Sequence, residues 1–218
     1  MFQTVMQSLA EGFLKTLEIF ALTLAGAIPL GFIIAFGSMS RFKVLSFPVK
    51  FIVWIVRGTP LMLQLLIIYY GPGLLLGNNW WGSGSSGRFI AAMVAFIFNY
   101  ACYFSEIFRG GIEGVPRGQR EAGQVLGMTN RQIFFQVTLM QVVKRIVPPM
   151  GNEVITLVKD TSLAFSISYV EMFTIAKQIA AAKTTMVPFV AAGIFYYIFN
   201  FVVAWVMELL EKKFSYYH

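Results

Sequence analysis

The 218-residue chain has a single cysteine and a single histidine, and charged residues make up only 12% of it. Cys102 and His218 alone cannot build a disulfide framework or a Cys/His metal centre, so both are excluded. In place of charge the chain is apolar, with 57% hydrophobic and 16% aromatic residues. This composition is typical of a protein whose solvent is a lipid bilayer.

The chain also lacks the motifs that hold nucleotides or carry catalysis. It has no G-x-x-x-x-G-K-[ST] loop, H-E-x-x-H helix or nucleophile elbow, so we expect no cofactor, metal ion or catalytic residue in this chain, and an intramembrane enzyme is unsupported. Gly82, Gly84 and Gly87 match G-x-G-x-x-G but follow two tryptophans instead of a strand, which excludes a dinucleotide site. The net charge of +7 is spread between apolar runs and does not indicate nucleic-acid binding.

Five apolar stretches are long enough to cross a bilayer, which needs about 20 residues per helix. We therefore predict an all-α membrane protein with one transmembrane domain over residues 1–218 and about five spans. The stretches run roughly over 16–37, 59–77, 89–108, 150–172 and 187–209.

Basic residues concentrate in two of the connections between these spans, and cytoplasmic loops are the ones rich in Lys and Arg. This places the N-terminus outside and the C-terminus in the cytoplasm. The basic residues are Arg41, Lys43, Lys50 and Arg57 in the first connection, and Arg109, Arg117, Arg120, Arg131, Lys144 and Arg145 in the second.

Prolines suggest where two spans begin. Thr59 and Pro60 predict an N-cap and a first helical position at the start of the second span. Pro148 and Pro149 are expected to separate the second basic connection from the fourth span.

The connection over 109–147 is too long for a simple link between helices, and its signals are those of ordered structure. Pro116 can open a short helix over 117–126, and Gly127 supplies its stop. Thr129 and Gln132 form a capping-box pair that starts a second helix. The two helices would meet at a glycine corner that projects toward a partner; the alternative is an amphipathic hairpin lying on the membrane without one.

This loop resembles the E-A-A-x3-G-x9-I-x-L-P motif of ABC importer permeases. Gly123 stands in place of the second Ala, Val137 in place of Ile and Met140 in place of Pro. Residues 57–61, 106–112 and 159–163 are also similar to the polar amino acid permeases of the histidine, glutamine and arginine type. The motif positions to which the resemblance gives ATPase coupling are Glu121, Ala122, Gly123, Gly127 and Leu139.

The resemblance implies a MetI-like helical domain in a bacterial cytoplasmic membrane. It implies a dimeric pore made with a second permease, either identical or different. It also implies two ATPase subunits that hold ATP and Mg²⁺, and an external solute-binding protein that delivers an amino acid.

Ionisable residues within spans are costly, so each is a functional candidate. Glu106 lies three residues before Arg109, a spacing that favours a structural ion pair. Lys159 and Asp160 diverge on a helix and need other partners or a water-filled path; with Thr161 and Ser162 they form a polar break that could face the pore.

Glu153 shares a helical face with Asp160, which gives a stripe with two acids in a low-dielectric setting. One hypothesis is that Glu153 contacts the amino group or basic side chain of a transported amino acid, with Asn99 and Tyr103 opposite. The alternative is that its carboxylate caps the start of its helix.

The sequence therefore predicts the permease subunit of an ATP-driven importer of polar amino acids that works by alternating access. If Glu153 contacts a positive group of the substrate, the amino acids are cationic. The alternative is a secondary, ion-coupled amino acid transporter, which would need no cytoplasmic corner. Dependence of uptake on ATP or on an ion gradient separates the two.

Overall fold

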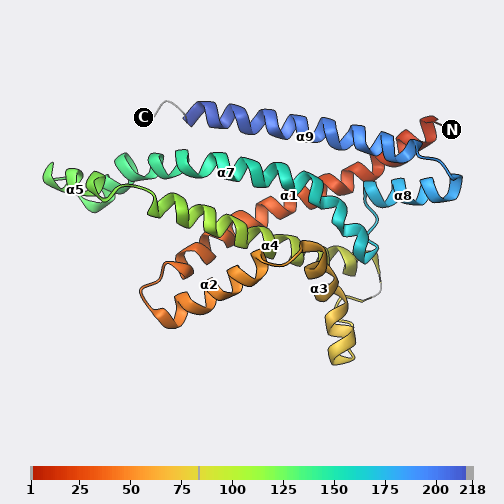
Figure 1. The fold of residues 1–218 in the computed structure, drawn as a ribbon, viewed down its shortest axis with the longest axis horizontal. Helices are drawn as coiled ribbons and strands as arrows, with labels where there is room; N and C mark the ends of the chain where they lie inside the picture. Colours follow the sequence, from red (N-terminus) through yellow and green to blue (C-terminus); the bar gives the residue numbers. More distant parts are fainter. Residues whose placement is uncertain (1, 83, 215–218) are drawn as a thin grey trace.

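A computed structural model describes residues 2–82 and 84–214, and His218 lies outside these ranges. Helices pack along a common long direction, and the described residues contain no strand (Figure 1). The prediction of an all-α fold is confirmed. The first turn of α1 and the last turn of α9 lie at opposite ends of the molecule, while the side of the membrane on which each lies stays a prediction.

The elements are named here in chain order. The membrane part up to the long connection comprises α1 (Phe2–Ser38), α2 (Lys43–Arg57), α3 (Leu61–Leu76) and α4 (Ser85–Glu113). The connection comprises α5 (Arg117–Val125), α6 (Asn130–Gln132) and the π-helical η1 (Ile133–Thr138). The remainder comprises α7 (Leu139–Asp160), the 3₁₀ segment η2 (Thr161–Ile167), α8 (Met172–Lys183) and α9 (Val187–Phe214).

Three helices of the described chain, α1, α4 and α9, are long and apolar enough to cross a membrane. The pair formed by α2 and α3 would be a fourth crossing if it counts as one broken span. Of the other two predicted spans, 59–77 corresponds to α3, a helix of 16 residues, and 150–172 runs from α7 through η2 to the first residue of α8.

A sharp corner precedes the second predicted span. The axes of α2 and α3 meet at 108°, and α3 leaves the bundle (Figure 1). Thr59 does not cap α3 as predicted: its hydroxyl donates to the carbonyl of Ile55, at 3.0 Å, and so closes the end of α2. Pro60 flanks α3, which begins at Leu61. The Ile55 carbonyl at the end of α2 also accepts from the N–H of Gly58, at 3.1 Å.

The prediction for the fourth span is also corrected. Pro148 and Pro149 lie inside α7, which continues from Leu139 to Asp160. Inside a helix a proline removes one backbone hydrogen bond and its ring crowds the carbonyl four residues earlier, defects that neighbouring helices make tolerable in membranes. The break comes at Asp160, where the backbone tightens into η2.

The core lies between α1 and α4. Phe96, Tyr100, Phe104 and Phe108 recur every four residues on one face of α4 and are at most 2% exposed. Small residues of α1 let this aromatic face approach its backbone; a Cβ at Gly31 would lie 3.0 Å from Cβ of Phe104. Close packing of small residues against a neighbour is how membrane helices associate.

A buried carboxylate joins α8 to the bundle. Glu171 has no exposed surface, and it caps α8 by accepting from the backbone N–H of Phe173 at 2.7 Å and of Thr174 at 2.8 Å. The hydroxyls of Tyr196 on α9 and Thr16 on α1 donate to the same side chain, at 3.2 and 3.5 Å. Helices α1, α8 and α9 therefore meet at one carboxylate that accepts hydrogen bonds from all three.

Candidate functional site

The corner predicted within the long connection is present. α5 ends in a Schellman motif, in which Gly127 adopts a φ of 75°. The N–H of Gly127 donates to the carbonyl of Gln124, and the N–H of Met128 donates to the carbonyl of Gly123. The capping box follows, because the Thr129 hydroxyl accepts from Gln132 N–H and the Gln132 side chain accepts from Thr129 N–H. The capped end of α5 and the capped start of α6 together fix the angle of the corner.

The structure explains why glycine stands at position 123, where the motif has alanine. A Cβ at this residue would lie 2.8 Å from Cγ1 of Ile133, which is buried against α5. Glu121 and Ala122 are exposed on the outer face of α5, while Leu139 begins α7 and is half-buried.

The tip of this corner is apolar and open. Val125 is 86% exposed and Leu126 is 79% exposed. The corner projects from the end of the molecule, beyond the bundle (Figure 1). Exposed apolar side chains on a rigid projection are typical of a surface that docks with a partner.

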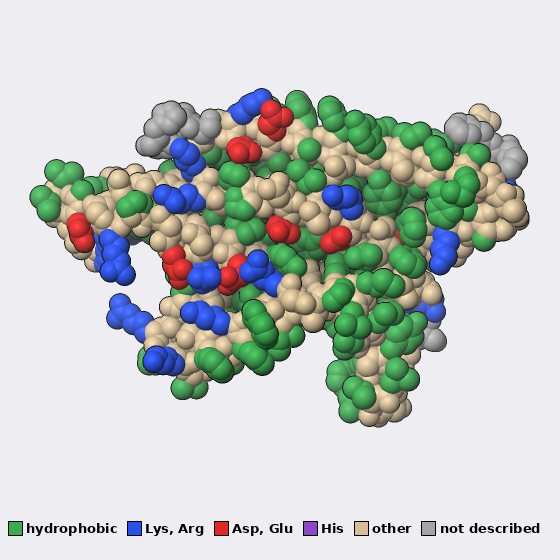
Figure 2. Space-filling model, viewed as in Figure 1, with side chains coloured by type: hydrophobic (Ala, Val, Ile, Leu, Met, Phe, Trp, Pro, Cys, Tyr) green, Lys and Arg blue, Asp and Glu red, His purple; other side chains and the backbone are tan. Residues whose placement is uncertain are grey.

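Charged side chains gather along one face of the bundle (Figure 2). The predicted pair is confirmed: Arg109 lies 2.6 Å from Glu106. The structure extends it to a network, because Arg109 also lies 2.8 Å from Glu113, and Arg57 at the end of α2 lies 3.6 Å from Glu106. The guanidinium of Arg57 also lies over the ring of Tyr103, 5.2 Å from its centre.

A cavity of about 510 Å³ opens at this network. Arg57 and Glu106 line it from α2 and α4, and Arg145 and Pro149 line it from α7. It therefore offers two guanidinium groups and a carboxylate to a small polar molecule.

Glu153 and Asp160 continue the charged face along α7. Glu153 is partly exposed in the interior of the helix, 14 residues after Leu139, so the alternative that it caps a helix start is wrong. Asp160 accepts a hydrogen bond from the hydroxyl of Tyr100, at 2.8 Å.

Asn99 and Tyr103 are on α4, and their side chains contact the corner between α2 and α3. Asn99 is 4% exposed and donates to the Gln64 side chain at 3.0 Å. The Gln64 amide in turn donates to the carbonyls of Val56 at 2.8 Å and Thr59 at 3.1 Å. Tyr103 donates to the carbonyl of Arg57 at 3.4 Å. These side chains satisfy carbonyls that the broken helix releases, and they hold Arg57 on the charged face.

The predicted polar break is split between two environments. Lys159 is exposed, and Ser162 is partly exposed with its hydroxyl bonded to the Lys159 carbonyl. Thr161 is fully buried, and its hydroxyl bonds to the Val158 carbonyl at 2.7 Å.

Sequence reasoning missed Gln64, Tyr100 and Glu171. Gln64 is the only side chain with an amide in the apolar run of α3, which was a usable signal. Tyr100 and Glu171 acquire their partners across 60 and 25 positions of sequence, a separation that no local pattern records.

Known proteins resemble this chain over most of its length. The family model described as binding-protein-dependent transport system inner membrane component matches residues 27–216. The chain is 38% identical to the octopine transport system permease protein OccM of Rhizobium radiobacter, over 85% of this chain and 78% of that protein. It is 35% identical to the L-cystine transport system permease protein TcyB of Bacillus subtilis (strain 168), over 96% and 87% of the two chains. The arginine transport system permease protein ArtQ of the same organism is 33% identical, over 93% and 90%.

Solved structures agree with these relatives. A chain from the crystal structure of an amino acid ABC transporter with histidines superposes with a TM-score of 0.84 and 28% identity, covering 95% of this chain and 94% of that one. The inward-facing MetNI methionine ABC transporter shares the fold, with a TM-score of 0.74 at 17% identity and coverage of 98% and 99%. The resemblance seen in the loop over 109–147 is confirmed: the chain belongs to the family of binding-protein-dependent transport system inner membrane components, the permease subunits of ABC importers.

Proposed function

We propose that this permease carries polar amino acids, with a preference for cationic ones, along the charged face by alternating access. The observation that carries the proposal is the charged face itself, on which Arg57 lies 3.6 Å from Glu106 and the carboxylates of Glu153 and Asp160 follow on α7. Charged groups in a membrane protein need water, a partner or a polar substrate. The named amino acid transporters among the relatives support the substrate class.

Recognition would use both signs of charge. An α-carboxylate suits the Arg57 guanidinium, which presents paired donors. The α-amino group or a basic side chain suits Glu153, and Asp160 adds a second negative charge on the same side. Tyr103, Lys159 and Ser162 would border the path, whereas Asn99 and Thr161 would act from behind it by fixing the backbone.

ATP hydrolysis on the partner subunits would be coupled to transport through the α5 corner. The partners that we propose are two ATPase subunits with ATP and Mg²⁺, a second permease subunit and an external binding protein. The exposed apolar tip at Val125 and Leu126 would enter a groove of the ATPase, with Glu121 and Ala122 at its edge and Leu139 passing the motion into α7. Because α7 carries Glu153 and Asp160, such a motion reaches the charged face directly.

Substrate competition in proteoliposomes containing the complete transporter and its binding protein tests the proposal. With Glu153→Gln, uptake of arginine and lysine should fall at least about tenfold relative to glutamine, because a charge-assisted contact is lost. Glu18→Gln, an exposed acid on α1 with no ion pair, is the matched control and should leave the ratio unchanged.

An unchanged ratio in Glu153→Gln would refute the specificity role. Uptake that follows an imposed ion gradient and ignores ATP would refute the importer mechanism itself.

A further inference from the structure

The buried aromatic row of α4 contains one hydroxyl. Phe96, Phe104 and Phe108 carry none, whereas the residue between them at position 100 is a tyrosine that is only 2% exposed. The ring of Tyr100 packs in the row like its neighbours, with its centre 6.0 Å from that of Phe104. A phenylalanine would fill the same space, and a buried hydroxyl is costly unless it is hydrogen-bonded. The hydroxyl of Tyr100 therefore needs an explanation apart from packing.

This hydroxyl reaches the end of α7. It donates to Oδ2 of Asp160 at 2.8 Å, a bond between residues 60 positions apart. No Lys or Arg among residues 2–82 and 84–214 forms an ion pair with Asp160, and the adjacent Lys159 is exposed. Asp160 thus has a neutral donor within the described chain, and its negative charge has no counter-ion there.

The second oxygen of Asp160 is left for another partner. Oδ1 accepts no hydrogen bond from the part of the chain that the structure describes, and the side chain is partly exposed. Asp160 follows Glu153 on the same face of α7 by two helical turns, which is about 10 Å along the axis. A charge without a counter-ion is costly in a membrane protein, and a cationic group of a substrate would supply one.

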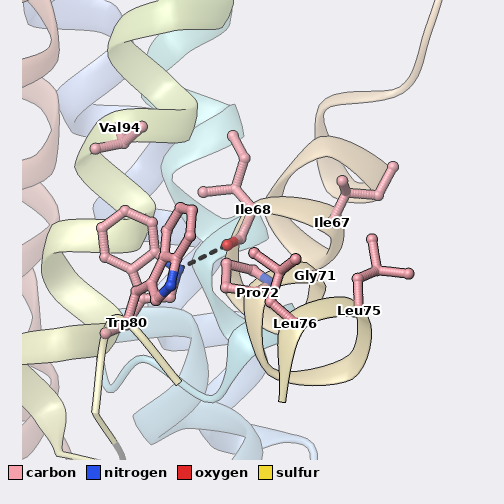
Figure 3. A pocket seen from close by; sticks show the side chains of 9 residues that line it. Ile67, Ile68, Gly71, Pro72, Leu75, Leu76, Trp80 and Val94 are labelled. Atoms are coloured by element: carbon pink, nitrogen blue, oxygen red, sulfur yellow. Dashed lines mark hydrogen bonds between the residues drawn. The ribbon is translucent and has the colours of Figure 1, made fainter. Parts of the chain in front are cut away.

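An apolar cavity beside α4 offers no such charge. It has a volume of about 510 Å³ and lies between α3, α4 and the connection that joins them (Figure 3). No charged side chain is among its lining residues. The indole Nε1–H of Trp81 donates at 2.7 Å to the carbonyl of Ile68, which loses its helical partner because Pro72 has no N–H (Figure 3). A cationic substrate group therefore finds its counter-charge on the charged face and not in this cavity.

We infer that Tyr100 is a positioning residue of the proposed amino acid path, because it holds one oxygen of Asp160 and leaves the other for a cationic group of the substrate. The inference rests on the proposed function. A carboxylate that is fixed beforehand loses less side-chain freedom when it binds. Glu153 and Asp160 then offer two successive contacts to a cation that moves along α7, and translocation favours several moderate sites over one tight site.

Uptake of arginine and of glutamine in proteoliposomes, with the complete transporter and its binding protein, tests the inference. Tyr100→Phe removes the hydroxyl and keeps the ring. It should lower the ratio of arginine uptake to glutamine uptake at least about fivefold, because a hydrogen bond to a charged group is lost. Tyr69→Phe is the matched control: Tyr69 is a buried tyrosine of α3 whose hydroxyl bonds to none of the described residues, and the ratio should not change.

A double variant shows whether Tyr100 acts through Asp160. Asp160→Asn should lower the ratio by itself, and adding Tyr100→Phe to it should lower the ratio no further. A further fall in the double variant would overturn the inference. An equal fall of both uptakes in Tyr100→Phe would also overturn it, because Tyr100 would then act through packing alone.

The unchanged transporter separates this inference from the proposed function. If it prefers arginine to glutamine and Tyr100→Phe keeps that preference, the role of Tyr100 is wrong and the proposed function stands. If the unchanged transporter has no preference for arginine, the proposed cationic specificity is wrong, and the inference fails with it.

Discussion

Replacing Gln64 by leucine removes the centre of the corner between α2 and α3 while keeping a side chain of similar size. Its amide donates to two carbonyls of the broken helix and accepts from Asn99. Gln64→Leu therefore leaves the buried Asn99 amide and the carbonyls of Val56 and Thr59 with fewer partners. We expect the corner to loosen and Arg57 to leave its position on the charged face.

The magnitude follows from these groups. An unsatisfied buried amide costs about 1–3 kcal/mol, and the Val56 carbonyl keeps longer bonds, from the Thr59 hydroxyl at 3.4 Å and the Thr59 N–H at 3.5 Å. A net loss of about 2–4 kcal/mol corresponds to a roughly 30- to 1,000-fold shift away from the observed corner. The rest of the fold should survive, because the packing of α1 on α4 does not involve Gln64.

Uptake in proteoliposomes and thermal unfolding of the purified complex measure the effect. Gln64→Leu should reduce uptake at least about tenfold and lower Tm, by roughly 2–4 °C for each kcal/mol lost. Gln178→Leu, an exposed glutamine on α8 without a hydrogen bond, is the matched control and should change neither.

A double-mutant cycle gives the decisive comparison. Adding Asn99→Leu to Gln64→Leu removes the stranded amide, so the two losses of stability should sum to about 1–2 kcal/mol more than the loss in the double variant. Strictly additive losses would refute the hydrogen-bonded corner. Full uptake by Gln64→Leu would refute its role in transport.

Three other changes test separate parts of the molecule. Glu121→Lys should leave membrane insertion intact but abolish uptake and stimulation of the ATPase; unchanged uptake would contradict docking at α5. Glu171→Gln should lower Tm, because the α8 cap loses a charge that accepts two backbone N–H groups. Trp81→Phe should destabilise by about 1–3 kcal/mol by stranding the Ile68 carbonyl, whereas Trp80→Phe removes no hydrogen bond and should be nearly neutral.

The α5 corner was predictable because its signals are local. Pro116 before α5, the positive φ at Gly127 and the pairing of Thr129 with Gln132 each depend on residues within a few positions. The ion pair of Glu106 with Arg109 is local for the same reason. Short-range chemistry of this kind can be read without knowing the packing.

The breaks in the spans were not predictable, because they depend on the groups that cover them. Two prolines in α7 leave the helix intact, while the hydroxyl of Thr59, two residues beyond the end of α2, donates back to the Ile55 carbonyl and does not cap α3. The bond between Tyr100 and Asp160 likewise needs two helices to be placed side by side. Proline marks lost donors, but tertiary contacts decide where a helix turns.

The charged face borders both breaks, and this coincidence has a physical basis. A broken helix releases backbone carbonyls, and in a bilayer these must be satisfied by side chains or by water. Gln64 and Tyr103 do so at the end of α2, and the hydroxyls of Thr161 and Ser162 do so at the end of α7. Polar groups and helix breaks are thus concentrated together, beside Arg57 and Asp160. The unbroken helices α1 and α4 supply the rigid frame, so changes in their packing should alter stability without altering the order in which substrates are preferred.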